Sequence, residues 1–429
     1  MTNSDSDLVI VIRGRGRVSA LGLGLDWSAP TTSPFTQHPA GLPVAALPAA
    51  AEAAVAELRQ SHPAYRQLDR TVLLAMLAAR AAARQNKRHS ERSEESRSES
   101  SHLFATIPSE ILRFALNDVP LADTNQLQLA VSIGSSRGAT GRLEEFHADF
   151  LADGRVPAAA SPLTTLGNVA SWVAFDAGQA GAAALSHSST CSSAFQALGN
   201  AVAWLRAGMA DRFLAGGAEA PLTDFTLAQM RAIGIYSPRG AADWPCRPGA
   251  GRPSTFVLGE GAAVFVLERG SRAALRAAGE TLPLLEGVGF GFEALGSKTG
   301  LSADGQHFQQ AMRAALRQAN ISPTEVDAVV LHSPGTPAGD AAERAALRAV
   351  FGEQLPLLLS NKWLLGHTLG ASAALSLDFA LHVLETQSWP TPPFATDVNG
   401  PDERPVRRVL VNAAGFGGNA ASVVVSLGM

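Results

Sequence analysis

The chain has 429 residues, of which 46% are hydrophobic and 17% charged, and its formal net charge is −4. This composition excludes a mainly disordered chain, which needs low hydrophobicity and high charge, and a length prior of roughly 150 residues per domain predicts two large halves or two to three domains. The small negative charge gives no sign of a nucleic-acid partner, and no apolar run reaches the roughly 18 residues of a membrane helix, so we expect no membrane span.

The N-terminal segment MTNSDSD is polar and acidic and does not look like a signal peptide. The chain has two cysteines, Cys191 and Cys246. They could form one disulfide or remain free, and free thiols fit a reducing cytosol. We therefore expect a cytoplasmic protein.

The first elements follow from apolar spacing. Residues 8–12 predict a buried strand, and the basic, Gly-rich stretch 13–17 predicts a turn after it. Residues 42–58 and 70–84 are rich in Ala and Leu at helical spacing. The segment 86–101 contains no apolar residue. It can bury nothing that offsets its ordering entropy, so we expect a solvated loop or disordered insertion; a docking tail for a charged partner is the alternative.

Strands and helices alternate over the rest of the chain, which predicts an α/β protein. One helical stretch, 192–209, has Arg206 as its single charged residue. A helix that is apolar on all sides is buried on all sides, so we expect it between two sheets. The expected strands are 127–133, 183–185, 212–215, 255–258, 262–267, 328–331, 408–412 and 421–427, and the other expected helices are 306–318, 341–350 and 371–385.

Cys191 comes just before this apolar helix. The positive end of a helix dipole favours thiolate, which would lower the pKa of Cys191 and make it a nucleophile. A buried structural cysteine is the alternative. Cys246 lies in a Pro-bounded loop without a helix start, and we interpret it as incidental.

Two histidines, His332 and His367, lie in Gly-rich turns after apolar runs. Strand ends on α/β scaffolds commonly carry catalytic side chains, although either histidine could be structural. His187, four residues before Cys191, is a local competitor. The turn 415–419 could place a backbone N–H beside a reacting oxygen, or could simply join two strands.

Together and in this order, these motifs resemble the elongating β-ketoacyl-acyl-carrier-protein synthases of the thiolase superfamily. The matching fragments extend over almost the whole chain. They are Val11–Gly22, Gly134–Gly138, Thr190–Ser193, Ala215–Ala220, Val257–Ala262, His332–Asp340, Asn361–Lys362, Gly366–His367 and Gly415–Asn419.

The resemblance implies a thiolase-like α/β fold with five layers, α-β-α-β-α, built from two similar halves. We expect residues 1–268 to form the half that carries the nucleophile and residues 269–429 the half that carries both histidines. The helix after Cys191 would then lie in the central layer. The segment 86–101 lies outside the family pattern.

The resemblance also implies catalytic roles. Cys191 matches the family nucleophile, His332 and His367 its two histidines, and Lys362 its lysine. Two histidines separate the elongating enzymes from the initiating synthases and plant-type polyketide synthases, which pair one histidine with an asparagine.

Further positions match supporting roles in the family. The backbone N–H groups of Cys191 and Phe416 would form the oxyanion hole, and the Phe416 ring would gate the acyl pocket. Thr336 would bind the substrate arm. Glu260 and Asp340 match acidic positions that we interpret as supporting or structural.

By the same resemblance, the enzyme binds no cofactor or metal of its own. The acyl groups arrive on the phosphopantetheine of an acyl carrier protein, and the chain forms a homodimer or a heterodimer with a related ketosynthase-like subunit. Malonyl-carrier protein would lose carbon dioxide and condense with the acyl group on Cys191, in fatty-acid or polyketide-type elongation.

Two segments depart from the family. After the first histidine the family usually reads Gly-Thr-Gly-Thr or Gly-Thr-Ser-Thr, whereas this chain has Ser333-Pro-Gly-Thr336, so Pro334 stands where an arm-binding threonine is usual. The family sequence Arg-Pro-Phe-Asp is here Arg247-Pro-Gly-Ala250. These departures affect contacts with the carrier arm.

Two other functions remain. A non-catalytic chain-length-factor-like subunit of a ketosynthase heterodimer would typically lack the nucleophile, which is present here. A thiolase would carry a second catalytic cysteine in the late Gly-rich turn, where this chain has Phe416.

Overall fold

The computed structural model describes residues 7–98, 129–166, 168–179, 183–294, 296 and 301–428. In it, two sets of five strands form one continuous sheet path. The first set contains β1 (Leu8–Ser19), β5 (Leu129–Gly134), β6 (Ala184–His187), β7 (Arg212–Glu219) and β8 (Gly261–Ser271). The second contains β9 (Pro283–Phe292), β10 (Ala328–Val330), β11 (Leu357–Leu359), β12 (Arg408–Gly415) and β13 (Asn419–Leu427).

The two sets have the same topology. Their spatial orders are β6-β5-β7-β8-β1 and β11-β10-β12-β13-β9, which is third, second, fourth, fifth, first in both. In each set the second strand in this order, β5 or β10, pairs in parallel with both of its neighbours, and the remaining pairs are antiparallel. The sets meet where Ile10 and Val11 pair with Leu285 and Leu284. The expectation of two similar halves is therefore confirmed, although a boundary at 268/269 falls inside β8, which ends at Ser271.

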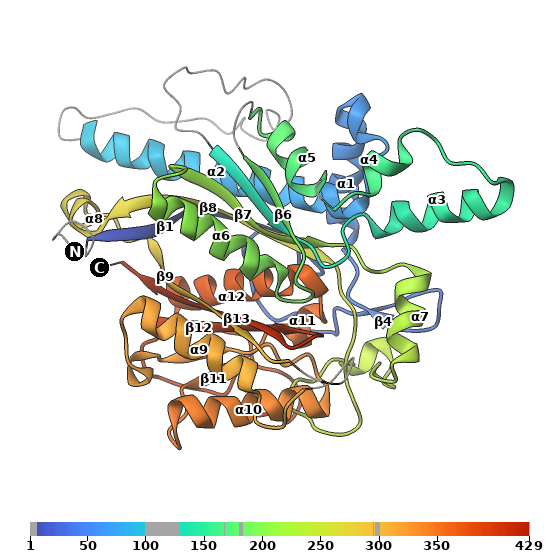
Figure 1. The fold of residues 1–429 in the computed structure, drawn as a ribbon. Coiled ribbons are helices and arrows are strands. Elements are labelled where there is room, and N and C mark those ends of the chain that lie inside the picture. Colours follow the sequence, from blue (N-terminus) through green and yellow to red (C-terminus); the bar gives the residue numbers. More distant parts are fainter. Residues whose placement is uncertain are drawn as a thin grey trace.

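Helices complete five layers (Figure 1). Helices α2 and α5 cover the outer face of the first half, α6 and α12 lie between the two halves, and α9 and α10 cover the outer face of the second. The helices are α1 (Ala49–Ser61), α2 (Arg70–Ser98), α3 (Thr140–Asp153), α4 (Ala160–Thr164), α5 (Asn168–Asp176), α6 (Ser193–Ala207), α7 (Asp224–Ala232), α8 (Arg272–Ala278), α9 (Gln306–Ala319), α10 (Pro337–Phe351), α11 (Lys362–Leu365) and α12 (Ser372–Thr386). The short strand β2 (Gly22–Leu23) pairs with β1 beside the main sheet path, and β3 (Thr36–Gln37) and β4 (Pro43–Val44) form a separate two-stranded sheet.

The central layer contains the most deeply buried helices. Helix α12 is buried from Ser372 to Leu381 without interruption. Helix α6 buries nine residues, but Ala203 and Arg206 are exposed near its C-terminal end. The apolar helix therefore lies between the sheets as expected, with one side of its last turns reaching the surface.

Three expectations at the start of the chain are wrong. Residues 13–17 form no turn but continue β1, because Gly14 and Gly16 let α2 pack directly on the strand: a Cβ atom at Gly16 would lie 2.2 Å from the Ala78 carbonyl oxygen. Residues 42–48 precede α1 rather than forming part of it.

The charged segment is also helical where the structure describes it. Helix α2 runs to Ser98, whereas we expected a loop from residue 86. Extending a formed helix adds a hydrogen bond for each residue fixed, so continuation is cheap compared with nucleation. Residues 99–101 lie outside the described residues.

Candidate active site

Three parallel strands bring the predicted catalytic residues of the second half to one edge. His332 follows β10, Lys362 and His367 follow β11, and Phe416 follows β12. Because β10 pairs in parallel with both β11 and β12, the carboxyl ends of all three strands lie at the same edge. Cys191 follows β6, which is the counterpart of β11 in the first half.

Cys191 lies in a tight turn that leads into α6. Thr190 before it adopts φ 49°, a left-handed conformation that non-glycine residues rarely take. The N–H groups of Ser192 and Ser193 donate to the carbonyls of Ser189 and Thr190 at 3.1 and 3.2 Å. The turn is therefore closed by its own backbone, and the thiol is 6% exposed at the helix start.

The late Gly-rich turn packs against the turn that contains Cys191. A Cβ atom at Gly415 would lie 1.8 Å from Thr190 Oγ1 and 2.8 Å from the Cys191 nitrogen, so only glycine fits there. Thr190 Oγ1 also donates to the Phe416 carbonyl at 3.4 Å. The Phe416 side chain is 40% exposed. The structure thus brings Phe416 and Cys191 together, with the aromatic side chain at the surface of the site.

The expected low pKa of Cys191 is wrong for the free protein. Burial raises the pKa of the Cys191 thiol to about 12, and the carboxylate of Glu219 raises it further. Arg137 and Lys362 act in the opposite direction. Desolvation of a thiolate therefore outweighs the favourable field at the helix start.

His332 and His367 form a pair. Their ring centroids are 5.2 Å apart and the rings are nearly perpendicular, at 87°. The backbone of His367 is fixed by hydrogen bonds with Val257 and Gly259, of 2.7 and 3.1 Å. Phe256, whose ring centroid is 5.5 Å from that of His367, belongs to the same apolar cluster as Cys191. His367 therefore contacts the apolar cluster that contains Cys191.

Both imidazoles are neutral at ordinary pH. Burial, with a smaller effect from Lys362, lowers the pKa of His367 to about 3. Burial also holds the pKa of His332 well below its usual range, and His367 and Lys362 add to this effect. A neutral imidazole carries one N–H donor and one acceptor nitrogen, so each ring can donate one hydrogen bond.

Lys362 is buried, and none of the carboxylates in the described part of the chain forms an ion pair with its ammonium group. Its Nζ donates to Asn361 Oδ1 at 3.1 Å and to Ser376 Oγ at 2.9 Å. Burial lowers the pKa of Lys362 to about 8, and Cys246, Glu343 and Cys191 partly oppose this. The lysine is therefore poised to lose its charge near physiological pH.

Two buried carboxylates were not singled out from the sequence. Glu343 accepts hydrogen bonds from the N–H groups of His332 and Ser333, at 2.9 and 2.8 Å. Glu219 accepts from the N–H groups of Ser136 and Gly370, at 2.6 and 2.9 Å, and burial raises its pKa to about 7. Glu219 lay inside a fragment that carried the resemblance, whereas no local pattern marks Glu343.

The remaining predicted site residues are Asp340, Thr336 and Glu260. The first two contact or belong to the His332 turn, whereas Glu260 pairs with another element. Asp340 accepts hydrogen bonds from the N–H groups of Gly335 and Gly249, and burial raises its pKa to about 6. Thr336 precedes α10 in the same turn as His332. Glu260 instead pairs with Arg70, at 2.6 Å, under the N-terminal helices. This ion pair joins the start of α2 to the residue before β8.

Cys246 is fully buried, and a negative charge on its sulfur would raise the pKa of Lys362. Both cysteines are free. Within the described ranges, no group of three or more His, Cys, Asp or Glu residues is arranged to hold a metal ion, and no helix is both long and apolar enough to cross a membrane.

Two family models match this chain. The model "Beta-ketoacyl synthase, N-terminal domain" matches residues 88–273, and "Beta-ketoacyl synthase, C-terminal domain" matches residues 284–393. The chain belongs to the β-ketoacyl synthase family. Relatives in this family include a 3-oxoacyl-[acyl-carrier-protein] synthase, which is an acyltransferase. This synthase has the ketosynthase fold.

Two curated relatives show the range of this synthase family. The chain is 33% identical over 343 residues to "Granaticin polyketide putative beta-ketoacyl synthase 1" of Streptomyces violaceoruber, covering 73% of this chain and 79% of the relative. It is 32% identical over 335 residues to "3-oxoacyl-[acyl-carrier-protein] synthase 2" of Vibrio harveyi, covering 72% and 78%. The synthase is therefore similar to enzymes of both polyketide and fatty-acid elongation.

Solved structures confirm the thiolase-like ketosynthase fold. "The ishigamide ketosynthase/chain length factor" superposes with a TM-score of 0.77 at 21% identity, covering 98% of this synthase and 99% of that chain. A type II polyketide acyl-carrier protein in complex with its ketosynthase gives 0.76 at 21% identity, with the same coverage.

Proposed function

We propose that this synthase catalyses the decarboxylative condensation of malonyl-carrier protein with an acyl group held as a thioester on Cys191. The observation that carries the proposal is the pair of neutral imidazoles, His332 and His367, with ring centroids 5.2 Å apart. His367 also contacts Phe256 of the apolar cluster that contains Cys191. Such a pair can donate two hydrogen bonds to one developing oxyanion.

The first step is acyl transfer. The Cys191 sulfur attacks the acyl thioester of the carrier arm, the new carbon–sulfur bond forms on Cys191, and the arm leaves as a thiol that takes up the proton. The Cys191 thiol and the carrier-arm thioester become a Cys191 thioester and a carrier-arm thiol, so the step neither consumes nor releases a proton. The high pKa of free Cys191 is compatible with this exchange, provided that the proton moves as the bond forms.

The second step generates the carbon nucleophile. Malonyl-carrier protein loses carbon dioxide, and the electron pair of the broken bond forms an enolate whose oxygen accepts hydrogen bonds from His332 and His367. The cation of Lys362, when present, favours this anion. Burial keeps both imidazoles neutral by lowering their pKa values, and this cation adds a smaller effect. Decarboxylation is therefore assisted by donors that are already neutral and in place.

The third step joins the two carbon chains. The enolate carbon attacks the carbonyl of the acyl group on Cys191, and the backbone N–H groups of Cys191 and Phe416 would hold the oxyanion. Collapse releases Cys191, which takes up one proton. The products are a 3-oxoacyl-carrier protein and carbon dioxide, and the cycle consumes one proton overall.

The substrate arm would be phosphopantetheine carried by an acyl carrier protein, and the synthase itself would bind no cofactor. Thr336 supplies the remaining hydroxyl for the arm, since Pro334 has none. Phe416, at the surface of the site, would open for each arm in turn. Free cysteines fit the reducing cytoplasm, where we place the reaction.

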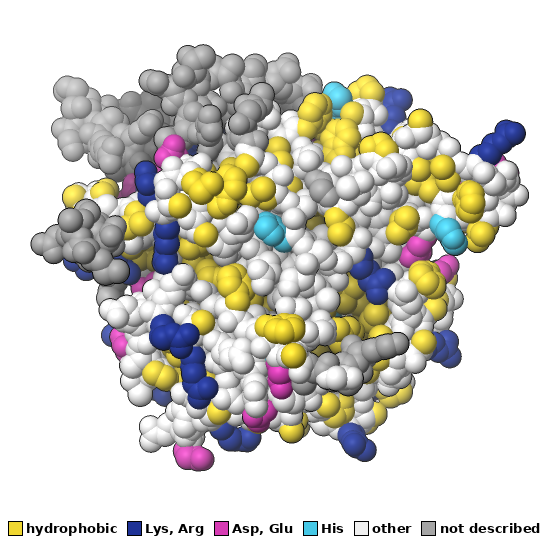
Figure 2. Space-filling view, in the orientation of Figure 1, with side chains coloured by type: hydrophobic (Ala, Val, Ile, Leu, Met, Phe, Trp, Pro, Cys, Tyr) yellow, Lys and Arg dark blue, Asp and Glu magenta, His cyan; other side chains and the backbone are white. Residues whose placement is uncertain are grey.

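An acyl carrier protein and a second ketosynthase-like subunit are the proposed partners. A related structure is described as an acyl-carrier protein in complex with its ketosynthase, and another as a ketosynthase/chain length factor. In this chain β6 is the last strand of its sheet, and the space-filling view shows apolar patches on the molecular face (Figure 2). A dimer, with itself or with a related subunit, would cover such surface.

Reconstituted condensation tests the proposal. The purified chain, given acyl- and malonyl-carrier protein, should form a 3-oxoacyl-carrier protein, and Cys191→Ala should abolish the product. Cys246→Ala is the matched control and should retain it. A chain that forms no product alone, but changes the product length of an active ketosynthase, would instead be a chain-length factor.

A further inference from the structure

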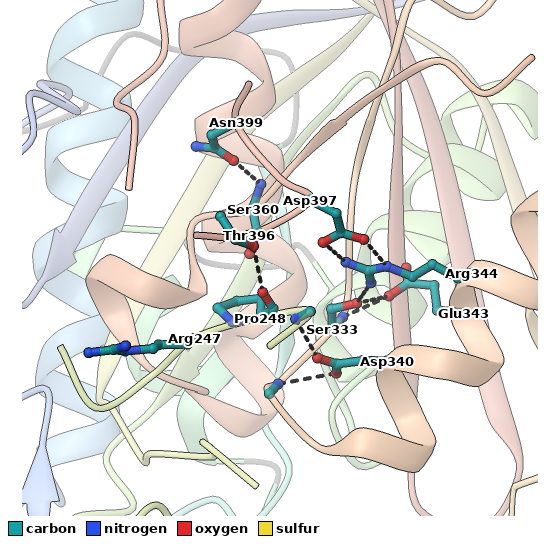
Figure 3. A network of polar contacts seen from close by, with 12 residues as sticks. Arg247, Pro248, Ser333, Asp340, Glu343, Arg344, Ser360, Thr396, Asp397 and Asn399 are labelled. Carbon is teal, nitrogen blue, oxygen red and sulfur yellow. Dashed lines mark hydrogen bonds and ion pairs between the residues drawn. The ribbon is translucent and has the colours of Figure 1, made fainter. Parts of the chain in front are cut away.

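Both departures from the family sequence lie against one ion pair. Ser333 stands where the family usually has glycine, and Gly249 stands where it usually has phenylalanine. In the structure Ser333 contacts Arg344 on α10, which is paired with Asp397 in the segment before β12 (Figure 3). Gly249 lies against both Arg344 and Asp397. One feature therefore links the two changes.

The ion pair is bidentate and largely buried at the arginine. Arg344 Nε and Nη2 each donate to an oxygen of Asp397, both at 2.8 Å. The third nitrogen, Nη1, donates to Ser333 Oγ. Arg344 is 8% exposed. The guanidinium is thus fixed on one side by a carboxylate and on the other by the hydroxyl next to His332.

Ser333 passes this restraint to the catalytic turn. Its N–H and Oγ both donate to Glu343 Oε2, at 2.8 and 2.7 Å, and the N–H of His332 donates to Glu343 Oε1 at 2.9 Å. Glu343 is fully buried and neighbours Arg344 in the sequence. Arg344 therefore supplies the positive charge beside a buried carboxylate that holds the His332 backbone.

Gly249 makes room for the same pair. A Cβ atom at this position would lie 2.2 Å from Asp397 Oδ1 and 3.1 Å from Arg344 Nη2, and φ is +77°. The Gly249 N–H donates to Asp340, which also accepts from Gly335 in the His332 turn. A phenylalanine at 249 is thus incompatible with the ion pair as it is placed.

We infer that Arg344, fixed by Asp397, is a positioning residue that sets the orientation of His332 through Ser333 and Glu343. Arg344 does not touch the reacting atoms, and its effect passes through the His332 turn. The inference rests on the proposed function, because it gives Arg344 a role in decarboxylation. Lysine has no planar fork and would reproduce the charge without the bidentate geometry.

The test separates the two half-reactions. Arg344→Met, Arg344→Lys and Ser333→Gly are compared with the parent in decarboxylation of malonyl-carrier protein and in acyl transfer to Cys191. Arg348→Met is the matched control, since Arg348 is exposed one turn later on α10. Arg344→Met should lower decarboxylation kcat about 10-fold or more, because small misplacements of reacting groups are costly. Acyl transfer should change by less than about 3-fold, the difference that separates this positioning effect from general unfolding.

Partial rescue and coupling complete the design. Arg344→Lys should lie between the parent and Arg344→Met. Ser333→Gly, which removes the hydroxymethyl side chain, should also lower decarboxylation. Adding Ser333→Gly to Arg344→Met should cost little more, since both changes act through one contact.

The outcomes distinguish the two claims. A parent chain without decarboxylation would overturn the proposed function. An active parent whose Arg344→Met and Ser333→Gly variants both match Arg348→Met, or lose both half-reactions equally while remaining folded, would overturn the positioning role alone. If Arg344→Met fails to fold, Ser333→Gly decides.

Discussion

Burial determines the charge state of each reactive side chain. It raises the pKa of Cys191 to about 12, lowers that of His367 to about 3 and brings that of Lys362 to about 8. At neutral pH the site therefore holds a thiol and two neutral imidazoles beside a single ammonium group. Such a site is suited to exchanging thioesters and to donating hydrogen bonds, rather than to storing a thiolate.

The two histidines should be separable from the nucleophile. His332→Ala and His367→Ala should each lower decarboxylation on the order of 100-fold or more, as for the loss of one oxyanion donor, while at least one variant keeps acyl transfer to Cys191. His147→Ala, on exposed α3, is the control. Unchanged decarboxylation in either variant would remove that histidine from the role.

Lys362 should cost stability at neutral pH. Its pKa is about 8 in the folded chain and 10.5 in the reference state. Between these values the unfolded chain holds a proton that the folded chain has lost, so the stability of the parent rises with pH. Lys362→Met should therefore be more stable than the parent at pH 7, by up to about 3 kcal/mol, and the gap should close toward pH 10.

The two oxygens that accept from the ammonium group stay hydrogen-bonded without it, because Ser376 Oγ donates to Asn361 Oδ1 at 3.2 Å. Chemical denaturation of both proteins at pH 7 and pH 10 measures the gap. A Lys362→Met variant that is less stable than the parent at pH 7, with no change in the gap at pH 10, would contradict the depressed pKa.

At the scale of elements, the contact of β1 with α2 should tolerate no added side chain. Gly16→Ala places a Cβ atom 2.2 Å from the Ala78 carbonyl oxygen and should destabilise by about 1–3 kcal/mol or more, as overpacking does. Gly240→Ala is the control, since Gly240 has φ −70° and open space around it. Equal melting temperatures for the two variants would show that α2 can move away.

Spacing in the sequence predicted most elements but not those fixed by tertiary contacts. The Arg-Gly alternation of residues 13–17 looks like a turn, yet Arg15 is paired with Asp378 on α12 at 2.9 Å and belongs to a strand. Strands β9 and β11 were missed, as were helices α3, α5, α7 and α8. The expected strand 255–258 is wrong, since Phe256 and Leu258 form only isolated bridges. Repeated glycines make the β9 sequence look unlike a strand. In the structure Gly287, Gly289 and Gly291 let α9 approach the strand backbone.

Part of the candidate site was predictable, because local sequence patterns mark three of its residues. Cys191, His332 and His367 stand at element ends that the sequence marks by apolar runs and glycines. Glu343 and Arg344 contact a turn that precedes them by ten or more residues. No periodicity in the sequence connects that turn with these two residues. Only the folded structure shows that Ser333, which replaces the usual glycine of the family, contacts Arg344.

At the scale of the whole molecule, we expect a dimer and an electrostatic carrier-protein interface. Light scattering should give twice the 44.5 kDa of one chain, or show a stable pair with a related subunit. Carrier proteins of this kind are acidic, so their affinity should fall as salt is raised from low to high ionic strength. An active monomer, or an affinity indifferent to salt, would contradict these expectations.

The most direct measurement is the mass of the acyl-enzyme. After a short incubation with acyl-carrier protein and no malonyl substrate, the chain should gain the mass of one acyl group, and peptide mapping should place it on Cys191. Cys246→Ala should load equally, and Cys191→Ala not at all. Addition of malonyl-carrier protein should then discharge the acyl group as a 3-oxoacyl product. Loading on Cys246, or an acyl group on Cys191 that malonyl-carrier protein does not discharge, would contradict the proposed condensation.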